Sequence, residues 1–112
     1  MQRTFSTHQH RAADQFTRLQ TQMEAINELM IHSWNQAVAA LMFNRPPEHL
    51  HKENDQVGVA VIWSRDHGLS VHSRNSDQHP WFPAEFEKLR EIDRLVALQL
   101  LEVILADAKI ER

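Results

Sequence analysis

The sequence has no cysteine, no tyrosine and only two glycines in 112 residues. Without cysteine the chain forms no disulfide, presents no thiolate nucleophile and builds no Cys-ligated zinc site or iron–sulfur cluster. Gly58 and Gly68 are too few for a phosphate-binding loop or a dinucleotide-binding signature, and the serine-hydrolase and zinc-protease motifs are absent as well. No motif therefore points to an enzyme, and we expect no cofactor.

Long hydrophobic runs are also missing. The residues after Met1 are mostly polar, unlike the apolar centre of a secretion signal, and no stretch approaches the roughly 18 consecutive apolar residues of a membrane span. We therefore expect a cytoplasmic protein that makes no membrane contact.

An excess of positive charge is a third absence. The 12 lysines and arginines are outnumbered by 15 aspartates and glutamates, and the formal net charge of −3 disfavours the broad basic surface of a nucleic-acid-binding protein. Protonation of all eight histidines would change this charge to +5, so charge-dependent behaviour should vary with pH.

The composition that remains is that of an ordinary globular protein, with 42% hydrophobic and 24% charged residues, and the length suits one domain over residues 1–112. From about residue 8 to residue 43, apolar residues recur every three or four positions and fall within an arc of about 80° on a helix. These residues are Phe16, Leu19, Met23, Ile26, Met30, Trp34, Ala37 and Leu41. Because Pro46 and Pro47 prevent continuation, we expect this helix to end near Asn44.

The middle of the chain favours one β-hairpin over residues 57–74. Residues 45–56 are polar and have no period, which is typical of a connector. The segment from Val57 to Trp63 is rich in β-branched residues and predicts a strand that is buried on both faces. Gly68 suits the turn, and the alternation from Leu69 to Arg74 predicts a return strand with one face in solvent.

A closing helix is expected over residues 83–110, because Pro83 suits a first helical position and acidic residues follow it. Its first half is amphipathic. In its second half Leu98, Leu101 and Leu105 occupy the side that charged residues hold earlier, so only a narrow polar strip remains. A helix that is apolar nearly all round needs to be covered nearly all round.

These elements predict an α+β fold in the order helix, two-stranded antiparallel hairpin, helix. Two strands make a poor sheet in water, and a first helix of roughly 34 residues, about 50 Å long, exceeds the size of a compact chain of this length. We therefore expect a homodimer, closed through helices or strand edges, with Leu98, Leu101 and Leu105 at the interface. The alternative is a monomer whose first helix kinks near Ser33 and folds over the hairpin.

The abundance of histidine raises the question of a metal site. His49 and His51 are weak candidates, because residues two apart can share one ion only in extended backbone, and a solvated loop is the simpler interpretation. Glu24, Glu28 and His32 share one side of the first helix, but that side faces away from the apolar stripe, so we expect it to be exposed. No specific metal site is predicted.

One patch around the hairpin combines imidazole, guanidinium and aromatic side chains, which suit an anionic or planar ligand or a protein partner. Its members are Arg65, His67, His72, Arg74, His79 and Trp81. The alternative is a solvated hairpin face, with Trp81 and Phe82 packed against the last helix as part of the core.

Three functions are compatible with these features. The favoured one is a non-enzymatic, homodimeric interaction or regulatory protein that presents its histidine- and arginine-rich hairpin and loops to a protein partner. The second is a small-ligand binder or an acid–base enzyme that uses His67, His72 and His79. The third is a weak nucleic-acid binder that uses a local basic patch in spite of the acidic total charge.

Overall fold

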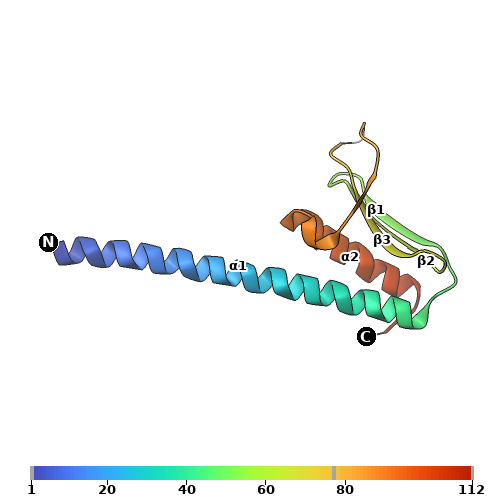
Figure 1. Ribbon diagram of the computed structural model, residues 1–112, viewed down its shortest axis with the longest axis horizontal. Coiled ribbons are helices and arrows are strands. Elements are labelled where there is room, and N and C mark those ends of the chain that lie inside the picture. Colours follow the sequence, from blue (N-terminus) through green and yellow to red (C-terminus); the bar gives the residue numbers. More distant parts are fainter. Residues whose placement is uncertain (1, 77, 112) are drawn as a thin grey trace.

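A computed structural model describes residues 2–76 and 78–111, with side chains from Arg11 onward. In this part of the chain the elements are α1 (Gln2–Asn44), β1 (Leu50–Asn54), β2 (Val59–Ser64), β3 (Gly68–Ser73), β4 (Phe82–Ala84), the short 3-10 helix η1 (Phe86–Lys88) and α2 (Glu91–Asp107). The fold is α+β, with two α-helices and a four-stranded antiparallel sheet (Figure 1).

The first helix is one uninterrupted element of 43 residues. Its predicted end near Asn44 is confirmed, whereas its start lies at Gln2 and not near residue 8. The helix passes through Ser33 without a break and runs straight (Figure 1). The kink at Ser33 that a folded-over monomer requires is therefore not present.

A left-handed residue and two prolines end α1. Arg45 has a φ of 44° and donates its backbone N–H to the carbonyl of Leu41 at 2.7 Å, which caps the last turn. Pro46 and Pro47 follow immediately and cannot extend the helix. The local sequence signal is strong enough here to fix the end of the helix without help from the rest of the fold.

The sheet has the strand order β1-β2-β3-β4, and all neighbouring pairs are antiparallel. The segment predicted as a two-stranded hairpin contains β2 and β3, which are the two central strands of this sheet and whose register pairs Ser64 with Gly68 and Val59 with Ser73. The expectation of only two strands is wrong, because a segment on each side adds an edge strand to this hairpin.

The first added strand, β1, lies within the predicted connector over residues 45–56. It pairs with β2 from Leu50 opposite Trp63 to Asn54 opposite Val59. Its residues alternate between half-buried and exposed, but they are mostly polar, so pairing with β2 stabilises this strand more than an apolar face of its own. The ammonium group of Lys52 also forms an ion pair with Asp107 at 3.2 Å, which links β1 to α2.

The first turns of the predicted 83–110 helix form β4 and η1 instead. Ala84 pairs with Val71 of β3, which adds the second edge strand. The Phe86 ring then stacks on Trp34 with ring centroids 4.4 Å apart, and this contact draws η1 into the core. Tertiary packing thus outweighs the local helical preference of this segment, and α2 begins later than predicted.

Specific contacts hold both ends of α2. At its start the guanidinium of Arg90 donates to both carboxylate oxygens of Asp93 at 3.0 and 3.3 Å, and Asp93 is only 5% exposed. At its end Lys109 is left-handed with a φ of 58°, and Ile110 donates its N–H to the carbonyl of Leu105 at 2.9 Å. This is a Schellman-type ending, in which the chain turns back on the last helical turn.

The core lies where α2 packs against both α1 and the sheet. The largest fully buried side chains include Trp63, Leu41 and Leu101. Trp63 also donates its indole N–H to the carbonyl of Pro46 at 2.9 Å, so its only polar atom is paired inside the core. These contacts join α1, the sheet and α2 into one hydrophobic core.

This arrangement corrects the premise on which the predicted interface was based. Leu101 is 0% exposed and Leu105 is 2% exposed within one copy of the chain, and Leu98 is half-buried against the same core. The reason is that α2 packs on both α1 and the sheet, which together cover most of its apolar surface. Leu101 and Leu105 are therefore not available to a second copy.

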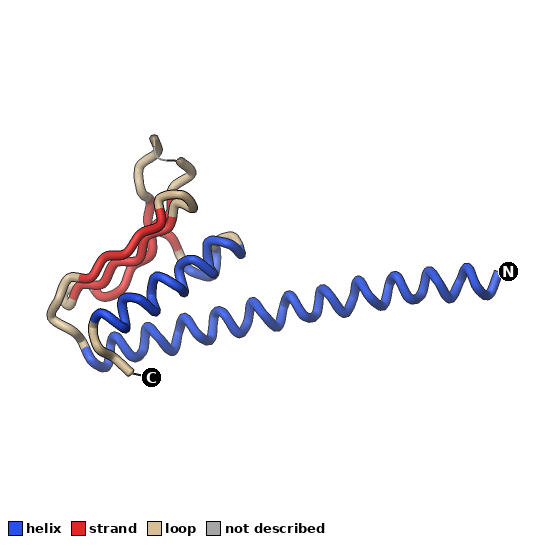
Figure 2. Tube along the Cα trace, turned by 180° about the vertical axis from the view of Figure 1, so that it is seen from behind, coloured by secondary structure: helices blue, strands red, loops and turns tan. Residues whose placement is uncertain are grey.

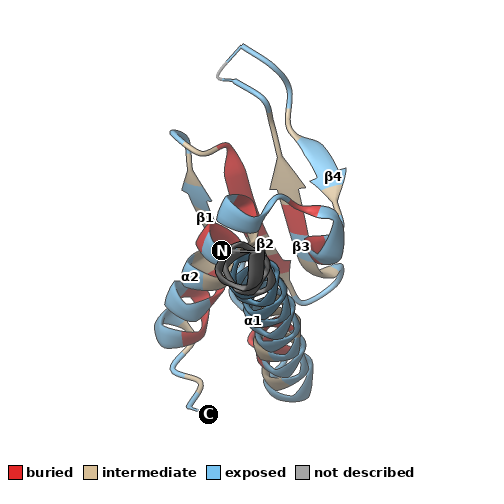
Figure 3. Ribbon diagram, turned by 90° about the vertical axis from the view of Figure 1, so that its left-hand side faces the viewer, coloured by how far each residue is buried: buried red, intermediate tan, exposed pale blue. Residues whose placement is uncertain are grey.

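The longest row of uncovered apolar side chains lies instead on the first half of α1. This half projects away from the core as a lone helix (Figure 2), and residues 11–26 are all exposed, as the pale blue turns behind the grey end in Figure 3 show. The molecule measures 69 × 36 × 17 Å and has a radius of gyration of 19.2 Å, against about 13 Å for a compact domain of similar length. Within the described residues, no helix combines the length and apolar character needed to cross a membrane.

Candidate functional site

The projecting half of α1 carries a row of large apolar side chains, which we call the free stripe. Its members are Phe16, Leu19, Met23 and Ile26, which are 68%, 60%, 51% and 54% exposed. They follow one another at steps of three, four and three residues, which places them on one face of the helix. A contiguous exposed apolar surface of this kind is typical of an interaction site.

The free stripe continues the face that the second half of α1 buries. Met30 is half-buried, and Trp34, Ala37 and Leu41 are buried against α2, η1 and the sheet. Two halves of one apolar face thus have different surroundings, because the folded part of the chain ends before it reaches the first half. The free stripe has the same apolar spacing as the buried half of this face, but no other described element packs on it.

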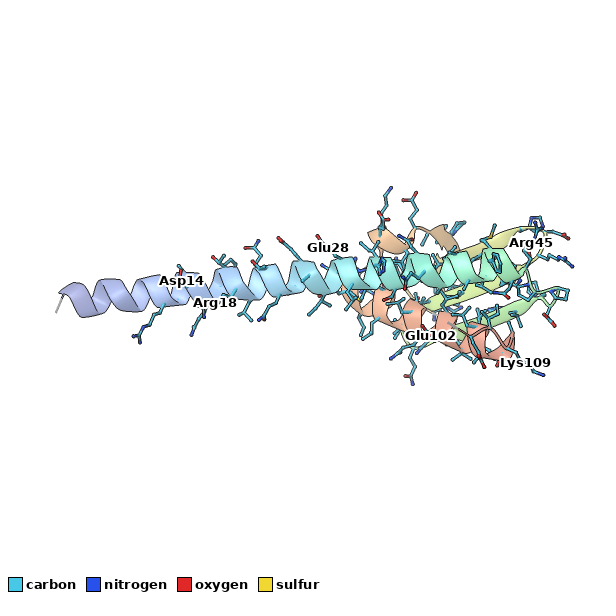
Figure 4. All side chains as sticks on the ribbon, turned by 90° about the horizontal axis from the view of Figure 1, so that it is seen from below. Asp14, Arg18, Glu28, Arg45, Glu102 and Lys109 are labelled. Carbon is cyan, nitrogen blue, oxygen red and sulfur yellow. The ribbon has the colours of Figure 1, made fainter. Side chains whose placement is uncertain are left out.

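The residues beside the free stripe are uncharged. In a heptad numbering that places Phe16 at position a, the positions flanking the stripe are occupied by Ala13, Gln15, Gln20, Gln22, Asn27 and Leu29. Leu29 is itself 63% exposed and widens the apolar surface. The charged side chains lie on the remaining positions, and Figure 4 shows Asp14 and Arg18 extending from the helix with no other element beside them.

A hollow lies where the free stripe meets α2, and we call it the notch. Its volume is about 570 Å³, and its lining residues are Ile26 and Met30 of α1, Glu91, Ile92 and Leu95 of α2, and Arg90. Ile92 is 54% exposed and Leu95 is 47% exposed. The notch therefore extends the apolar surface of the free stripe from α1 onto the start of α2.

A second candidate site is a hollow on the sheet, which we call the sheet-face pocket. Its lining residues are His51, Ala60, Ile62, His72, Trp81 and Pro83, and its volume is about 350 Å³. Val61 and Trp63 of β2 are buried in the core with the helices, so the alternating Ala60 and Ile62 face the other side of the sheet. The register places Ala60 opposite His72, and His51 opposite Ile62.

His72 is one of two histidines that line the sheet-face pocket. Burial lowers the pKa of its imidazole below the usual 6.5, and the neighbouring His51 lowers it further. Its Nδ1 atom is buried and has no hydrogen-bond partner within the described residues. His51 in turn lies 3.5 Å from the carboxylate of Glu53. His72 is thus favoured in its neutral form at neutral pH.

The structure brings together only part of the predicted binding patch. The guanidinium of Arg74 lies 4.3 Å from the centre of the Trp81 ring and donates to the carboxylate of Asp55 at 2.8 Å, beside the pocket that contains His72 and Trp81. Arg65 is exposed in the turn at the other end of β3. Arg74 therefore has a structural role in holding the loop after β3.

The three histidines proposed for acid–base chemistry do not share a site. His67 is exposed in the β2–β3 turn, His72 lies within β3, and His79 is in the loop before β4, where its Nδ1 is 2.6 Å from the hydroxyl of Ser76. The sheet separates the turn from the loop. His51 is the imidazole that sequence reasoning did not place beside His72, because β1 was interpreted as a connector.

The weak metal candidates do not lie in one cluster of ligands. His49 is exposed, and His51 lies 3.5 Å from Glu53 and lines the pocket with His72. Among the described residues, no three side chains of histidine, aspartate or glutamate come together as a metal would require. Glu24, Glu28 and His32 are exposed, as the sequence predicts.

A scan against protein-family models, a search of curated proteins and a search of solved structures each found no match. The function is therefore inferred from the free stripe, the notch and the sheet-face pocket.

Proposed function

We propose that this chain is a non-enzymatic interaction protein that acts as a homodimer, and that the free stripe of α1 is its dimer interface. The observation that carries the proposal is the row of four large apolar side chains, each more than half exposed, on a helix that leaves the core. Full burial of such a side chain contributes about 1.5 to 3 kcal/mol. Covering the stripe is thus a strong driving force for association.

The stability of α1 supports the same proposal. The projecting residues 11–29 form a helix about 28 Å long without tertiary contacts along most of its length. A helical stretch of this length is only marginally stable in water when no apolar face is packed. A covering helix would supply the missing packing.

The flanking residues favour a second copy as the cover. In a pair of helices, side chains beside the apolar seam come close to their counterparts, and like charges there repel. In this chain the flanking residues Gln15, Gln20, Gln22 and Asn27 are neutral and polar. Two identical helices therefore meet without repulsion at these positions.

In this proposal the rest of the molecule presents surfaces to a protein partner. Arg65 and His67 are exposed in the β2–β3 turn and remain candidates for that role. Arg74 is less suitable than the sequence suggests, because it is engaged by Asp55 and Trp81. Dimerisation through α1 leaves this turn uncovered.

The test is the molar mass of the full chain in solution, measured by light scattering at about 10 to 100 µM. We expect a mass of twice 13.1 kDa for the native sequence. Leu19→Asp places a charge in the middle of the free stripe and should reduce the mass to 13.1 kDa.

Thr21→Asp is the matched control, because it adds the same charge two residues away, on the opposite side of the helix. It should leave the mass of the dimer unchanged. A native chain that remains monomeric over this concentration range would contradict the proposal and would leave another protein or a lipid surface as the cover of the stripe. Equal effects of the two substitutions would show that the stripe is not the interface.

A further inference from the structure

We infer that the two copies associate with their α1 helices antiparallel, so that each free stripe packs on the other and each helix reaches the notch of the partner subunit. This inference rests on the proposed homodimer and adds its orientation and register. It follows from where α2 lies on α1, from the order of apolar residues in the free stripe and from the distribution of charge along the projecting helix.

The position of α2 argues against a parallel pair. The second half of α1 already uses its apolar face to bind α2, η1 and the sheet, as the burial of Trp34, Ala37 and Leu41 shows. In a parallel pair both folded parts would lie at the same end, on the faces that the two helices turn towards each other, so the helices would be forced apart there. In an antiparallel pair the folded parts lie at opposite ends, and each free stripe meets only another free stripe.

The spacing of the stripe sets a register in which every apolar layer is matched. Antiparallel helix pairs match position a of one helix with position d of the other. Phe16 then faces Ile26 of the partner subunit, and Leu19 faces Met23 of the partner subunit. The two-fold symmetry repeats both layers, so all four members of the free stripe are covered.

The same register places Ala12 at the level of Met30 of the partner subunit. Met30 lines the notch together with Ile92 and Leu95. Residues 2–11 of the partner helix would continue past the notch to the levels of residues 31–40, where α2 and the sheet cover this face of α1. The two helices must therefore cross at an angle that carries this end of the partner helix beside the folded part while Ala12 covers the notch.

Charge is complementary in the antiparallel orientation. Residues 11–18 carry Arg11, Asp14 and Arg18 with a net charge of +1, whereas residues 24–28 carry Glu24 and Glu28 with a net charge of −2. The antiparallel pair brings each of these segments beside the opposite one of the partner subunit. A parallel pair would instead bring the two segments of charge −2 to the same level. Because Glu24 and Glu28 lie outside the flanking positions, this repulsion acts at long range, is screened by salt and adds only a small preference to that set by the position of α2.

The resulting dimer is a rod with a folded part at each end. Residue 30 of one copy and residue 30 of the other would be about 27 Å apart along the paired helices. The sheet-face pockets and the β2–β3 turns are then held at opposite ends of the rod. The dimer would therefore present two identical binding surfaces at a fixed separation, as a bivalent spacer does.

The absence of cysteine makes the orientation directly testable by disulfide crosslinking. Phe16→Cys and Ile26→Cys are prepared as separate full-length chains, oxidised alone and as an equal mixture, and separated on a non-reducing gel. A disulfide needs Cα atoms within about 7 Å, so only facing positions react efficiently. We expect the covalent dimer in the mixture and little of it in either chain alone.

The matched control is a mixture of Phe16→Cys with Leu19→Cys, which tests a register shifted by seven residues and should crosslink poorly. Crosslinking of Phe16→Cys with itself and of Ile26→Cys with itself would show a parallel pair and overturn the inference. Efficient crosslinking of the control mixture would overturn the register. If light scattering shows a native monomer, the proposed homodimer itself fails, whereas a dimer that crosslinks in neither mixture contradicts the antiparallel pairing alone.

Discussion

At the scale of single residues, His72 links the sheet-face pocket to pH. Burial, and then the neighbouring His51, lower the pKa of its imidazole in the folded chain, whereas the unfolded chain has the ordinary value of about 6.5. The other charged groups near the pocket are Glu53, which lies beside His51, and Arg74, which stacks on Trp81. As the pH decreases below about 6.5, His72 takes up a proton in the unfolded chain more readily than in the folded chain. The free energy of unfolding therefore decreases as the pH is lowered, until the pH is below the folded-state pKa of His72.

Replacement of this imidazole should therefore reduce the acid sensitivity of the fold. We predict that the urea midpoint of the native chain falls more between about pH 7.5 and about pH 5.5 than the midpoint of His72→Gln, because glutamine takes up no proton in this range. His67→Gln, in the exposed β2–β3 turn, is the control and should keep the native pH response. If the urea midpoints of the native chain and of His72→Gln change equally with pH, His72 does not contribute to the acid sensitivity of the fold.

At the scale of elements, the turn between β1 and β2 depends on Gly58. Its φ is +82°, its carbonyl accepts the N–H of Arg74 at 2.9 Å, and a Cβ atom added there would overlap the backbone carbonyl oxygen of Arg74. Gly68, the first residue of β3, has a similar φ of +80°, but an added Cβ would have only the sulfur of Met42 nearby, at 4.0 Å. The two glycines thus share the left-handed backbone and differ in the space around them.

This difference predicts unequal effects of alanine at the two positions. Gly68→Ala should lower the free energy of unfolding by about 1 kcal/mol through backbone strain alone. Gly58→Ala should lower the free energy of unfolding by at least about 2 kcal/mol more than Gly68→Ala does, because the β1–β2 turn and the backbone of Arg74 must move apart. Urea unfolding of both variants measures the difference. Equal losses would mean that the contact between Gly58 and Arg74 does not constrain the sheet.

The elements with local signals could be predicted from the sequence. The proline pair ends α1 where expected, and the β-branched run and Gly68 place β2, the turn and β3. The elements that depend on distant partners could not. The polar strand β1 exists because β2 offers it a free edge, and η1 exists because Phe86 stacks on Trp34.

The candidate sites follow the same rule. The apolar stripe on the first helix was visible in the sequence, but its division into a covered and a free half depends on how far α2 reaches along α1. His72 and Trp81 were predicted to be near each other and do line one pocket, whereas His51 was missed together with β1. The predicted surplus of apolar surface was assigned to Leu101 and Leu105, which the single chain buries.

At the scale of the whole molecule, two parts of α1 differ in what stabilises them. Residues 30–44 are held by α2, η1 and the sheet, whereas residues 11–29 lack such contacts over most of their length. If a second copy covers the free stripe, the stability of residues 11–29 depends on protein concentration, and that of residues 30–44 depends mainly on the fold of the single chain. Residues 11–29 thus report on association of two copies, and residues 30–44 report on the fold of the single chain and serve as an internal reference.

Amide hydrogen exchange of the full chain, measured from low to high protein concentration, tests this account most directly. We predict that protection of residues 11–29 rises with concentration in the native chain and stays low at every concentration in Leu19→Asp, because the unpaired helix frays. Residues 30–44 should remain protected in both. Protection of residues 11–29 that does not change with concentration or with the substitution would contradict the claim that a second copy covers the free stripe.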